Sequence, residues 1–548
     1  MSLYTKFFTV LIKGFVLKKI FFLCNLFSIS IFANEYINYP FDWTNHFGLI
    51  SKNGRVIWND DWMYGILFFD GTFTNYPKRY GLDLNKNFTL FNTGAFLNQE
   101  LELDTTFVNT RIQYTQGDYY LDMLSINTTY ADTIRLLTMN GHKKTYTGPY
   151  ADYSLSILKP IQQSYFIEYN TNHFQAAIGH FVTSSGIPDS STNGSLNDRI
   201  FNASIQTKGH IGNWRWIFHG SQFNQKYAVQ HSSWNNPSIQ YLTRSMIQAK
   251  IINEIKGSIL IGFGFSGNLR ALSDVNSFSS KEWGSIYSNI SIKNFKIKGG
   301  FSSMNNEYNP FLRVLFHFDR KNKGVSIEAN RKIKPSYEFM PVNDINSKFE
   351  RTNSANINAW YSLPRSTIKI NLYSQNILQT NNDKIEILGC DLNLNYNIIG
   401  NWILSGYLRH LSNPNILSDG IGDLLEFTLS GNENLFNNNM ILFFNLGFTG
   451  WVNRKSDISF NPFYCTPIFI LDPNFTLKDQ WNLNSAISLK VSSLKVTWKM
   501  NNILRALQSR IDSINEEKTL IINNYFLHQN NRHMGRLMEI HIDWYFSD

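Results

Sequence analysis

The sequence predicts an all-β protein: a single large antiparallel transmembrane β-barrel of about 22 strands, within a range of about 18 to 22. Three observations lead to this prediction. Apolar and polar residues alternate along most of the chain, and short polar turns alternate with long loops. The composition is poor in charged residues and rich in aromatic residues. Successive side chains of a strand point to opposite sides, so such strands suit a wall between hydrocarbon and water.

Composition separates this chain from most soluble and helical membrane proteins. Of its 548 residues, 17% are charged and 15% are aromatic, and the mean hydropathy is −0.25. Because no long apolar run follows the N-terminus, this mixture favours a barrel that is apolar outside and polar inside. Transmembrane helices are therefore not expected beyond residue 33.

Residues 1–33 have the pattern of a secretory signal peptide. Lysines lead into the apolar run 20–32, and Ala33 supplies a small residue at its end. The run is shorter than the roughly 20 residues of a spanning helix, so we favour cleavage after Ala33 over a retained anchor. Cleavage removes four lysines and no acids, so Lys and Arg fall from 50 to 46 against 41 acids, and the net charge falls from +9 to +5. Nothing in the remaining chain resembles a nucleic-acid patch, so we expect no nucleic-acid partner.

Behind the signal peptide, residues 34–60 are predicted to form a short N-terminal segment on the periplasmic side, too short for a plug of its own. The barrel is predicted to occupy residues 61–548. Its first strands are expected within residues 86–130, where the composition suits strands although the alternation is noisy.

The clearest hairpin is predicted at residues 483–500. Apolar residues occupy odd positions up to Val491 and even positions from Leu494, so the phase flips across Ser492 and Ser493. A two-residue turn requires this flip, because it pairs the residues on either side of it on one face. The apolar pairs expected are Val491 with Leu494, Leu489 with Val496, and Ile487 with Trp498.

Nine such hairpins with short turns are predicted between residues 165 and 500. They pair 165–169 with 174–178, 201–207 with 214–218, 247–251 with 259–265, 290–292 with 295–297, 312–318 with 325–327, 357–363 with 368–372, 388–396 with 402–408, 425–429 with 440–448, and 483–491 with 494–500. Between the hairpins we expect long loops at 184–198, 222–238, 268–282, 336–353, 375–383, 412–423 and 450–478. Short turns on the periplasmic side and long loops outside are typical of outer-membrane barrels.

The last strand is predicted at residues 538–546, MEIHIDWYF, where the alternation has no break. Even positions are apolar and should face lipid, whereas Glu539, His541 and Asp543 should face the lumen. Nine hairpins, an opening strand and this closing strand give about 20 strands, and a pair within 86–130 brings the count to about 22.

The C-terminal sequence MGRLMEIHIDWYF, with Gly535 and Arg536 leading into the strand and Phe546 near its end, resembles the last segment of the barrels of TonB-dependent receptors and related large porins. The resemblance implies that the barrel-assembly machinery reads this aromatic end, although Ser547 and Asp548 follow it. Those receptors also carry a large plug domain and a motif for an energising partner, for which we find no room. The resemblance therefore implies a plug-free, porin-like relative without energised uptake.

Motifs for catalysis or cofactors are not recognised. Gly262, Gly264 and Gly267 spell G-x-G-x-x-G, but they lie in an alternating strand without a following helix, so they are better explained as small residues on the inner face of the barrel. Cys390 lies on an apolar face, and two distant cysteines make no metal motif. We therefore expect no enzyme activity, cofactor or metal.

Function is expected on the inner face of the wall, where alternation places both cations and acids. The candidate pore-lining residues are Arg215, Lys296, Lys298, Arg313, Lys369, Arg409, Lys495, Lys499, Glu168, Asp391, Glu426, Glu539 and Asp543. Charged groups inside a barrel are routine, so these side chains could simply be solvated. Their slight cationic excess favours anionic solutes.

These observations predict a porin-like channel in the outer membrane of a Gram-negative-type envelope, exported by its signal peptide, for passive or weakly selective passage of small solutes. Its expected partners are outer-membrane lipid or lipopolysaccharide, the barrel-assembly machinery and the solutes themselves. One alternative is a barrel that acts through its surface loops as a binding or adhesion protein. Others are a plug-less relative of TonB-dependent receptors and a secreted soluble sandwich, while a barrel enzyme is disfavoured because the sequence shows no triad.

Overall fold

The fold was analysed in a computed structural model of the chain. The structure describes residues 37–40, 43–44, 48–56, 106–149, 151, 160–186, 194–231, 238–255, 259–274, 278–304, 307–335, 349–379, 384–412, 422–454, 458–461, 466–469, 479–507 and 535–547. The predicted signal peptide and the predicted start of the barrel at residues 61–105 lie outside the described residues.

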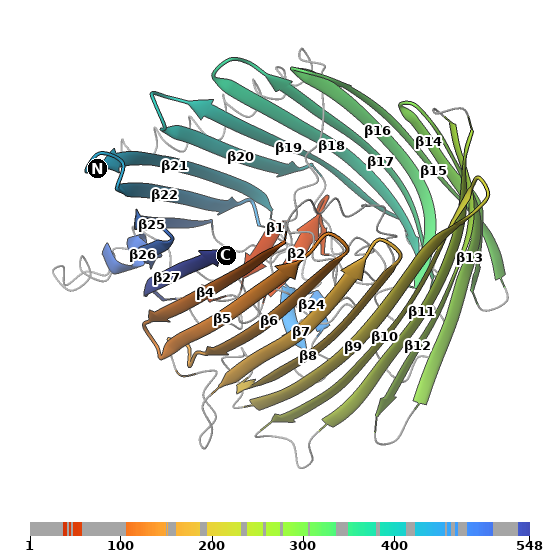
Figure 1. The fold of residues 1–548 in the computed structure, drawn as a ribbon, viewed down its shortest axis with the longest axis horizontal. Coiled ribbons are helices and arrows are strands. Elements are labelled where there is room, and N and C mark those ends of the chain that lie inside the picture. Colours follow the sequence, from red (N-terminus) through yellow and green to blue (C-terminus); the bar gives the residue numbers. More distant parts are fainter. Residues whose placement is uncertain are drawn as a thin grey trace.

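Twenty-two of the described strands pair antiparallel with their neighbours and close into one barrel (Figure 1). They are β4 (Phe107–Gly117), β5 (Leu121–Ala131), β6 (Arg135–Thr145), β7 (Ile161–Thr171), β8 (Phe174–Gly186), β9 (Gly194–Ile211), β10 (Trp214–His231), β11 (Ser238–Ile255), β12 (Ile259–Asp274), β13 (Phe278–Ile292), β14 (Phe295–Met304), β15 (Glu307–Arg320), β16 (Lys323–Pro335), β17 (Phe349–Ser362), β18 (Ser366–Gln379), β19 (Lys384–Asn397), β20 (Ile403–Leu411), β21 (Asp423–Leu435), β22 (Met440–Val452), β25 (Gln480–Val491), β26 (Leu494–Asn501) and β27 (Leu537–Ser547). The closing strand β27 pairs with the first strand β4. The predicted fold class and strand number are confirmed.

All nine predicted hairpins are present among the described strands. At the clearest one, Val491 pairs with Leu494, and the pairs beyond it follow the predicted register. Three of the two-residue turns between described strands have a first residue with positive φ, 51° at Ser492, 44° at Lys293 and 58° at Gly212. This backbone twist matches the twist of the flanking strands, which is why hairpin turns use it.

The two faces of the wall differ as the alternation predicts. The apolar positions of the predicted strands lie on the outside, where Ile540 is 52% and Phe263 is 54% exposed. In a bilayer this surface contacts hydrocarbon, and closure leaves no strand edge with unpaired backbone groups there.

Strands β9 to β12 are longer than predicted. They contain 16 to 18 residues, whereas a tilted strand crosses a bilayer with about 9–11. Much of the loops predicted at 222–238 and 268–282 therefore belongs to strands. The reason is that the alternation ends where the outer face turns polar, while the backbone hydrogen bonds of the ladder continue beyond that level.

Two small sheets are not part of the barrel wall. The first contains β1 (Ile37–Pro40), β2 (Gly48–Lys52) and β3 (Arg55–Val56), and β1 and β2 lie inside the ring of barrel strands (Figure 1). The second pairs β23 (Ile458–Asn461) with β24 (Thr466–Phe469). The described part of the predicted N-terminal segment thus enters the lumen; the absence of a plug domain stays a prediction, because residues 57–105 are not described.

Candidate functional site: the inner wall of the barrel

All of the predicted pore-lining residues lie on the inner face of the wall. Their strand positions alternate with the exposed apolar side chains, and the pairing registers carry this inner face from strand to strand around the barrel. Whether they line an open pore stays a prediction. The structure does show that they fall into separate groups with different surroundings.

The first group lies at the seam where the barrel closes. The guanidinium of Arg111 on β4 donates two hydrogen bonds to Asp543 on β27, at 2.7 and 2.5 Å. Lys499 on β26 donates to Glu539 at 2.6 Å. Opposite charges thus neutralise one another across three neighbouring strands, and these bidentate and charge-assisted contacts hold the seam.

The second group lies on β19 and β20. Asp391 and Arg409 are direct cross-strand partners, and Arg409 is 0% exposed. The side-chain amide of Asn371 donates to Asp391 at 2.9 Å. Both side chains are buried, so they belong to the packed part of the wall rather than to a solvated pore lining.

The turn between β2 and β3 docks beside this pair. Asn371 and Gln375 of β18 donate to the side-chain and backbone oxygens of Asn53, each at 3.3 Å. A Cβ atom at Gly54 would lie 2.8 Å from Leu411, which belongs to the buried apolar cluster on the inner face. The small sheet therefore touches the wall closely, and only glycine fits at its tip.

Two further contacts attach this segment to the opposite part of the wall. The indole nitrogen of Trp43 donates to the carbonyl oxygen of Gly535 at 2.9 Å. The buried ammonium of Lys144 on β6 donates to the carbonyl oxygen of Thr44 at 2.6 Å. The N-terminal segment thus spans the lumen between β6 and β18.

The inner face of β7 to β10 is also buried. Gln175 donates to Glu168 at 2.7 Å, and Gln225 donates to Asp198 at 2.9 Å. Ser164 and Asp198 are 0% exposed. These inner-face polar side chains are therefore buried rather than solvated.

A cationic group forms on the inner face of β10, β11, β14 and β15. The charge of Lys250 interacts with those of Arg215 and Lys296, and the charge of Lys298 interacts with those of Lys250 and Arg313. Lys298 and Arg313 are direct cross-strand partners, and Arg313 also pairs with Glu328 at 2.7 Å. We call Arg215, Lys250, Lys296, Lys298 and Arg313 the cationic patch.

Sequence reasoning missed Lys250, although its signal was present. Ile247, Ala249 and Ile251 were assigned to the outer face, and the position between the last two must then face the lumen. The remaining predicted charges lie elsewhere on the wall. Lys369 pairs across the sheet with Trp360 and Asn393, Glu426 pairs with Tyr407 and Thr449, and Lys495 lies 4.7 Å from the Phe443 ring centre.

Within the described residues, no group of His, Cys, Asp or Glu side chains could hold a metal ion. The described residues also contain no helix that is long and apolar enough to cross a membrane.

A closed antiparallel barrel with an apolar outside and a polar inside is an outer-membrane β-barrel. The solved structures that it resembles are of this class. No protein-family model and no curated protein matches the chain.

Similar solved structures include the copper transporter OprC, with a TM-score of 0.62 at 10% identity over 93% of this chain and 94% of that chain. The ferric yersiniabactin uptake receptor FyuA of Yersinia pestis has a TM-score of 0.61 at 10% identity over 94% of each chain. The apoprotein of the FrpB iron transporter of Neisseria meningitidis has a TM-score of 0.60 at 11% identity over 93% and 95%. The resemblance to the barrels of TonB-dependent receptors is confirmed as a resemblance of fold.

Proposed function

We propose that this protein takes up a small anionic solute across the outer membrane, through a lumen that its own chain closes until the solute binds. The observation that carries the proposal is the burial of inner-face polar side chains on two parts of the wall, around Ser164 and Asp198 and around Asn371 and Arg409. Passive passage needs an open water-filled path, whereas a closed lumen calls for a movement coupled to binding.

The segment that would move is the luminal sheet β1 to β3. Among the described residues, its polar contacts with the wall include hydrogen bonds to the backbone oxygens of Asn53 and Thr44. Hydrogen bonds of this kind contribute about 0.5–1.5 kcal/mol each, somewhat more where the donor is charged. The free energy of solute binding can offset the loss of these hydrogen bonds.

The cationic patch supports an anionic cargo. Its cations lie close enough to interact on the inner face, so an anion that passes this part of the wall is attracted and a cation is repelled. The similar structures are named as an iron transporter, a copper transporter and a ferric yersiniabactin uptake receptor, which supports transport rather than surface adhesion as the activity of this protein.

Conductance in planar bilayers tests the closed lumen. The wild-type protein should stay closed, whereas the combined variant Lys144→Met, Asn371→Ala, Gln375→Ala should open, because it removes the wall donors that hold the luminal sheet. Asn401→Ala, at the exposed turn before β20, is the control and should stay closed. A wild-type protein that conducts steadily would instead establish a passive channel.

Ion preference tests the anionic cargo. Under a KCl gradient, the reversal potential of the open combined variant should indicate selectivity for chloride. Preference for potassium would refute an anionic cargo and leave the closed lumen as a separate result.

A further inference from the structure

Two cations face each other on the outside of the barrel. Arg199 of β9 and Lys226 of β10 are direct cross-strand partners, and both side chains are exposed on the outer face. Like charges placed directly opposite one another destabilise a strand pair. An anion held between them would remove this cost and gain charge-assisted hydrogen bonds from both.

The neighbouring outer-face residues show where this pair lies relative to the membrane. On β10 the outward positions are apolar from Trp214 to Phe218 and polar at Gln222 and Asn224, just before Lys226. The Gln222 amide donates to Asn224 at 3.0 Å, and Ser245 of β11 donates to Gln222. Such polar chains are costly in hydrocarbon, so they mark the headgroup level.

This headgroup level belongs to the outer leaflet. Lys226 lies toward the loop end of β10, whereas Trp214 follows the short turn at the other end. Short turns of outer-membrane barrels are periplasmic. The lipid at the outer surface of a Gram-negative-type envelope carries phosphate groups, which match two adjacent cations.

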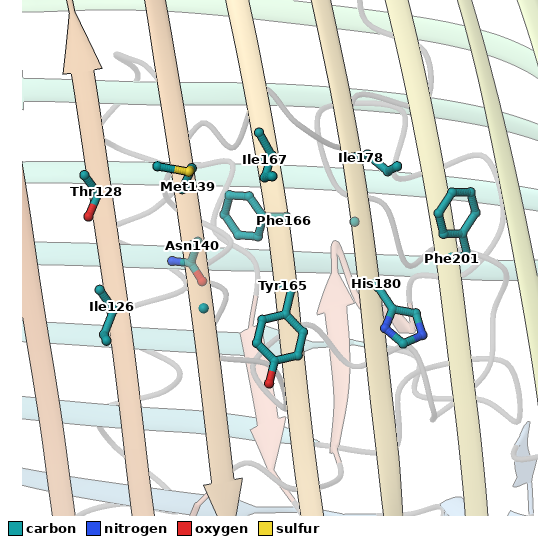
Figure 2. A pocket seen from close by; sticks show the side chains of 12 residues that line it. Ile126, Thr128, Met139, Asn140, Tyr165, Phe166, Ile167, Ile178, His180 and Phe201 are labelled. Carbon is teal, nitrogen blue, oxygen red and sulfur yellow. The ribbon is translucent and has the colours of Figure 1, made fainter.

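An apolar groove opens on the same outer face, beside the charge pair (Figure 2). Its volume is about 460 Å³, and Gly141 lies in its lining. On three successive strands, Tyr165 pairs with His180 and His180 pairs with Phe201, and all three side chains line the groove (Figure 2). Phe201 lies two residues from Arg199 on the same face of β9, so a chain lying in the groove can reach the cations with its headgroup.

We propose that this surface is a binding site for a phosphate-bearing lipid of the outer leaflet, such as lipopolysaccharide. The phosphate lies between Arg199 and Lys226, and one acyl chain lies in the groove. The ring of Tyr241, with its centre 5.6 Å from the Lys226 ammonium, holds that cation in place. The site is separate from the lumen and does not depend on the proposed uptake function.

Lipid retention tests the phosphate contact. The full-length protein is isolated from outer membranes in a mild non-ionic detergent, and lipid-bound phosphate is measured per chain by native mass spectrometry. Wild-type protein should retain stoichiometric phospholipid or lipopolysaccharide of the outer leaflet, and the double variant Arg199→Gln, Lys226→Gln should lose it. Lys321→Gln removes one exposed cation at the short turn between β15 and β16 and should retain it. Equal retention in all three proteins would overturn the proposal.

Added ligands distinguish a lipid from a free anion. Delipidated protein is titrated with lipid A, with dephosphorylated lipid A and with inorganic phosphate, and the shift of the thermal midpoint is followed. Lipid A should bind at least about tenfold more weakly to the double variant, because each lost charged hydrogen bond corresponds to about that factor. Inorganic phosphate that matches lipid A would reduce the site to an anion site, and equal binding of dephosphorylated lipid would show that the cations play no part; either result overturns the proposal.

Filling the groove tests the acyl-chain contact. A Cβ atom at Gly141 would lie 3.8 Å from the Tyr165 ring, an ordinary contact, so Gly141→Leu should fold and occupy groove volume. Lipid A should then bind more weakly, while the circular dichroism of the barrel stays unchanged. Unaltered lipid A affinity in a folded Gly141→Leu protein would remove the groove from the site.

Discussion

The ammonium nitrogen of Lys298 on β14 lies 3.7 Å from the centre of the Tyr287 ring on β13. The same ring fills the space beside Gly264 on β12, where a Cβ atom would lie 2.5 Å from the ring. A cation over an aromatic face is attracted to the ring and loses conformational freedom. Tyr287 on β13, with the space left by Gly264 on β12, therefore positions the charge of Lys298 within the cationic patch.

Replacing Lys298 by Gln should lower the anion preference of the open lumen. A unit charge about 4 Å from an ion contributes about 1 kcal/mol in water, attractive for chloride and repulsive for potassium, so the chloride-to-potassium permeability ratio should fall by up to about thirtyfold. The reversal potential of the open combined variant, with and without Lys298→Gln, measures this. Lys321→Gln, at a turn outside the lumen, should leave the ratio unchanged; an unchanged ratio in Lys298→Gln would mean that passing ions do not approach the patch.

Gly264→Ala should destabilise the barrel by about 1–3 kcal/mol, because the added methyl group overlaps the Tyr287 ring and must displace it. Gly267→Ala is the matched control on the same strand, since a Cβ atom there meets nothing within 4 Å. Urea unfolding in lipid vesicles compares the free energies of unfolding. Equal stability of the two variants would show that the Tyr287 ring moves aside without cost.

A charge at Ile542 should cost much more than one at His541. Ile542 lies on the outer face between Val496 and Tyr114, so Lys there contacts lipid and should cost about 2–4 kcal/mol near mid-membrane. His541 faces the lumen, where it contacts Thr115 at 2.6 Å, and Lys there loses about one hydrogen bond, or about 1 kcal/mol. The free energies of folding into vesicles should rank the variants in this order, and the reverse order would invert the assignment of faces.

The turn between β5 and β6 should contribute an acid-sensitive part of the stability. Arg135 donates to Asp132 at 2.6 Å, and this bond, with a second from the Ile134 amide, lowers the pKa of Asp132 to about 2. An unfolded Asp has a pKa of about 3.9, so this contribution is complete above pH 3.9 and is lost as the pH falls through about 2.

Asp132→Asn provides the measurement. The difference in stability between the wild-type protein and this variant should shrink between pH 4 and pH 2 in fluorescence-detected unfolding. Parallel curves over this range would show that the contact contributes no pH dependence.

Much of the wall was predictable because its information is local. Alternation at a period of two assigned Ile540 and Phe263 to the lipid side, and the phase flip at Ser492 set the register of β25 against β26. A one-residue slip would turn every side chain of a strand to the other face, so the pattern specifies the register. The inner-face placement of the charged residues followed from the same alternation.

The groups that surround each inner-face side chain could not be predicted from the alternation. Arg409 and Lys298 have the same pattern in the sequence, yet Arg409 is buried beside Asp391 and the luminal sheet, whereas Lys298 belongs to the cationic patch. Strand lengths were also misjudged, since β9 to β12 continue past the level where alternation ends.

The sequence by itself determined which face of each strand meets lipid, where the chain turns, and that the strands close into a barrel of about 22, because these properties depend on neighbours along the chain. Only the tertiary structure decided what lies next to the inner face and which outer residues meet. The docking of Asn53 on β18, the gathering of Lys250 with Lys298, and the facing of Arg199 and Lys226 all depend on pairing between distant segments, which the ladder register and barrel closure bring together.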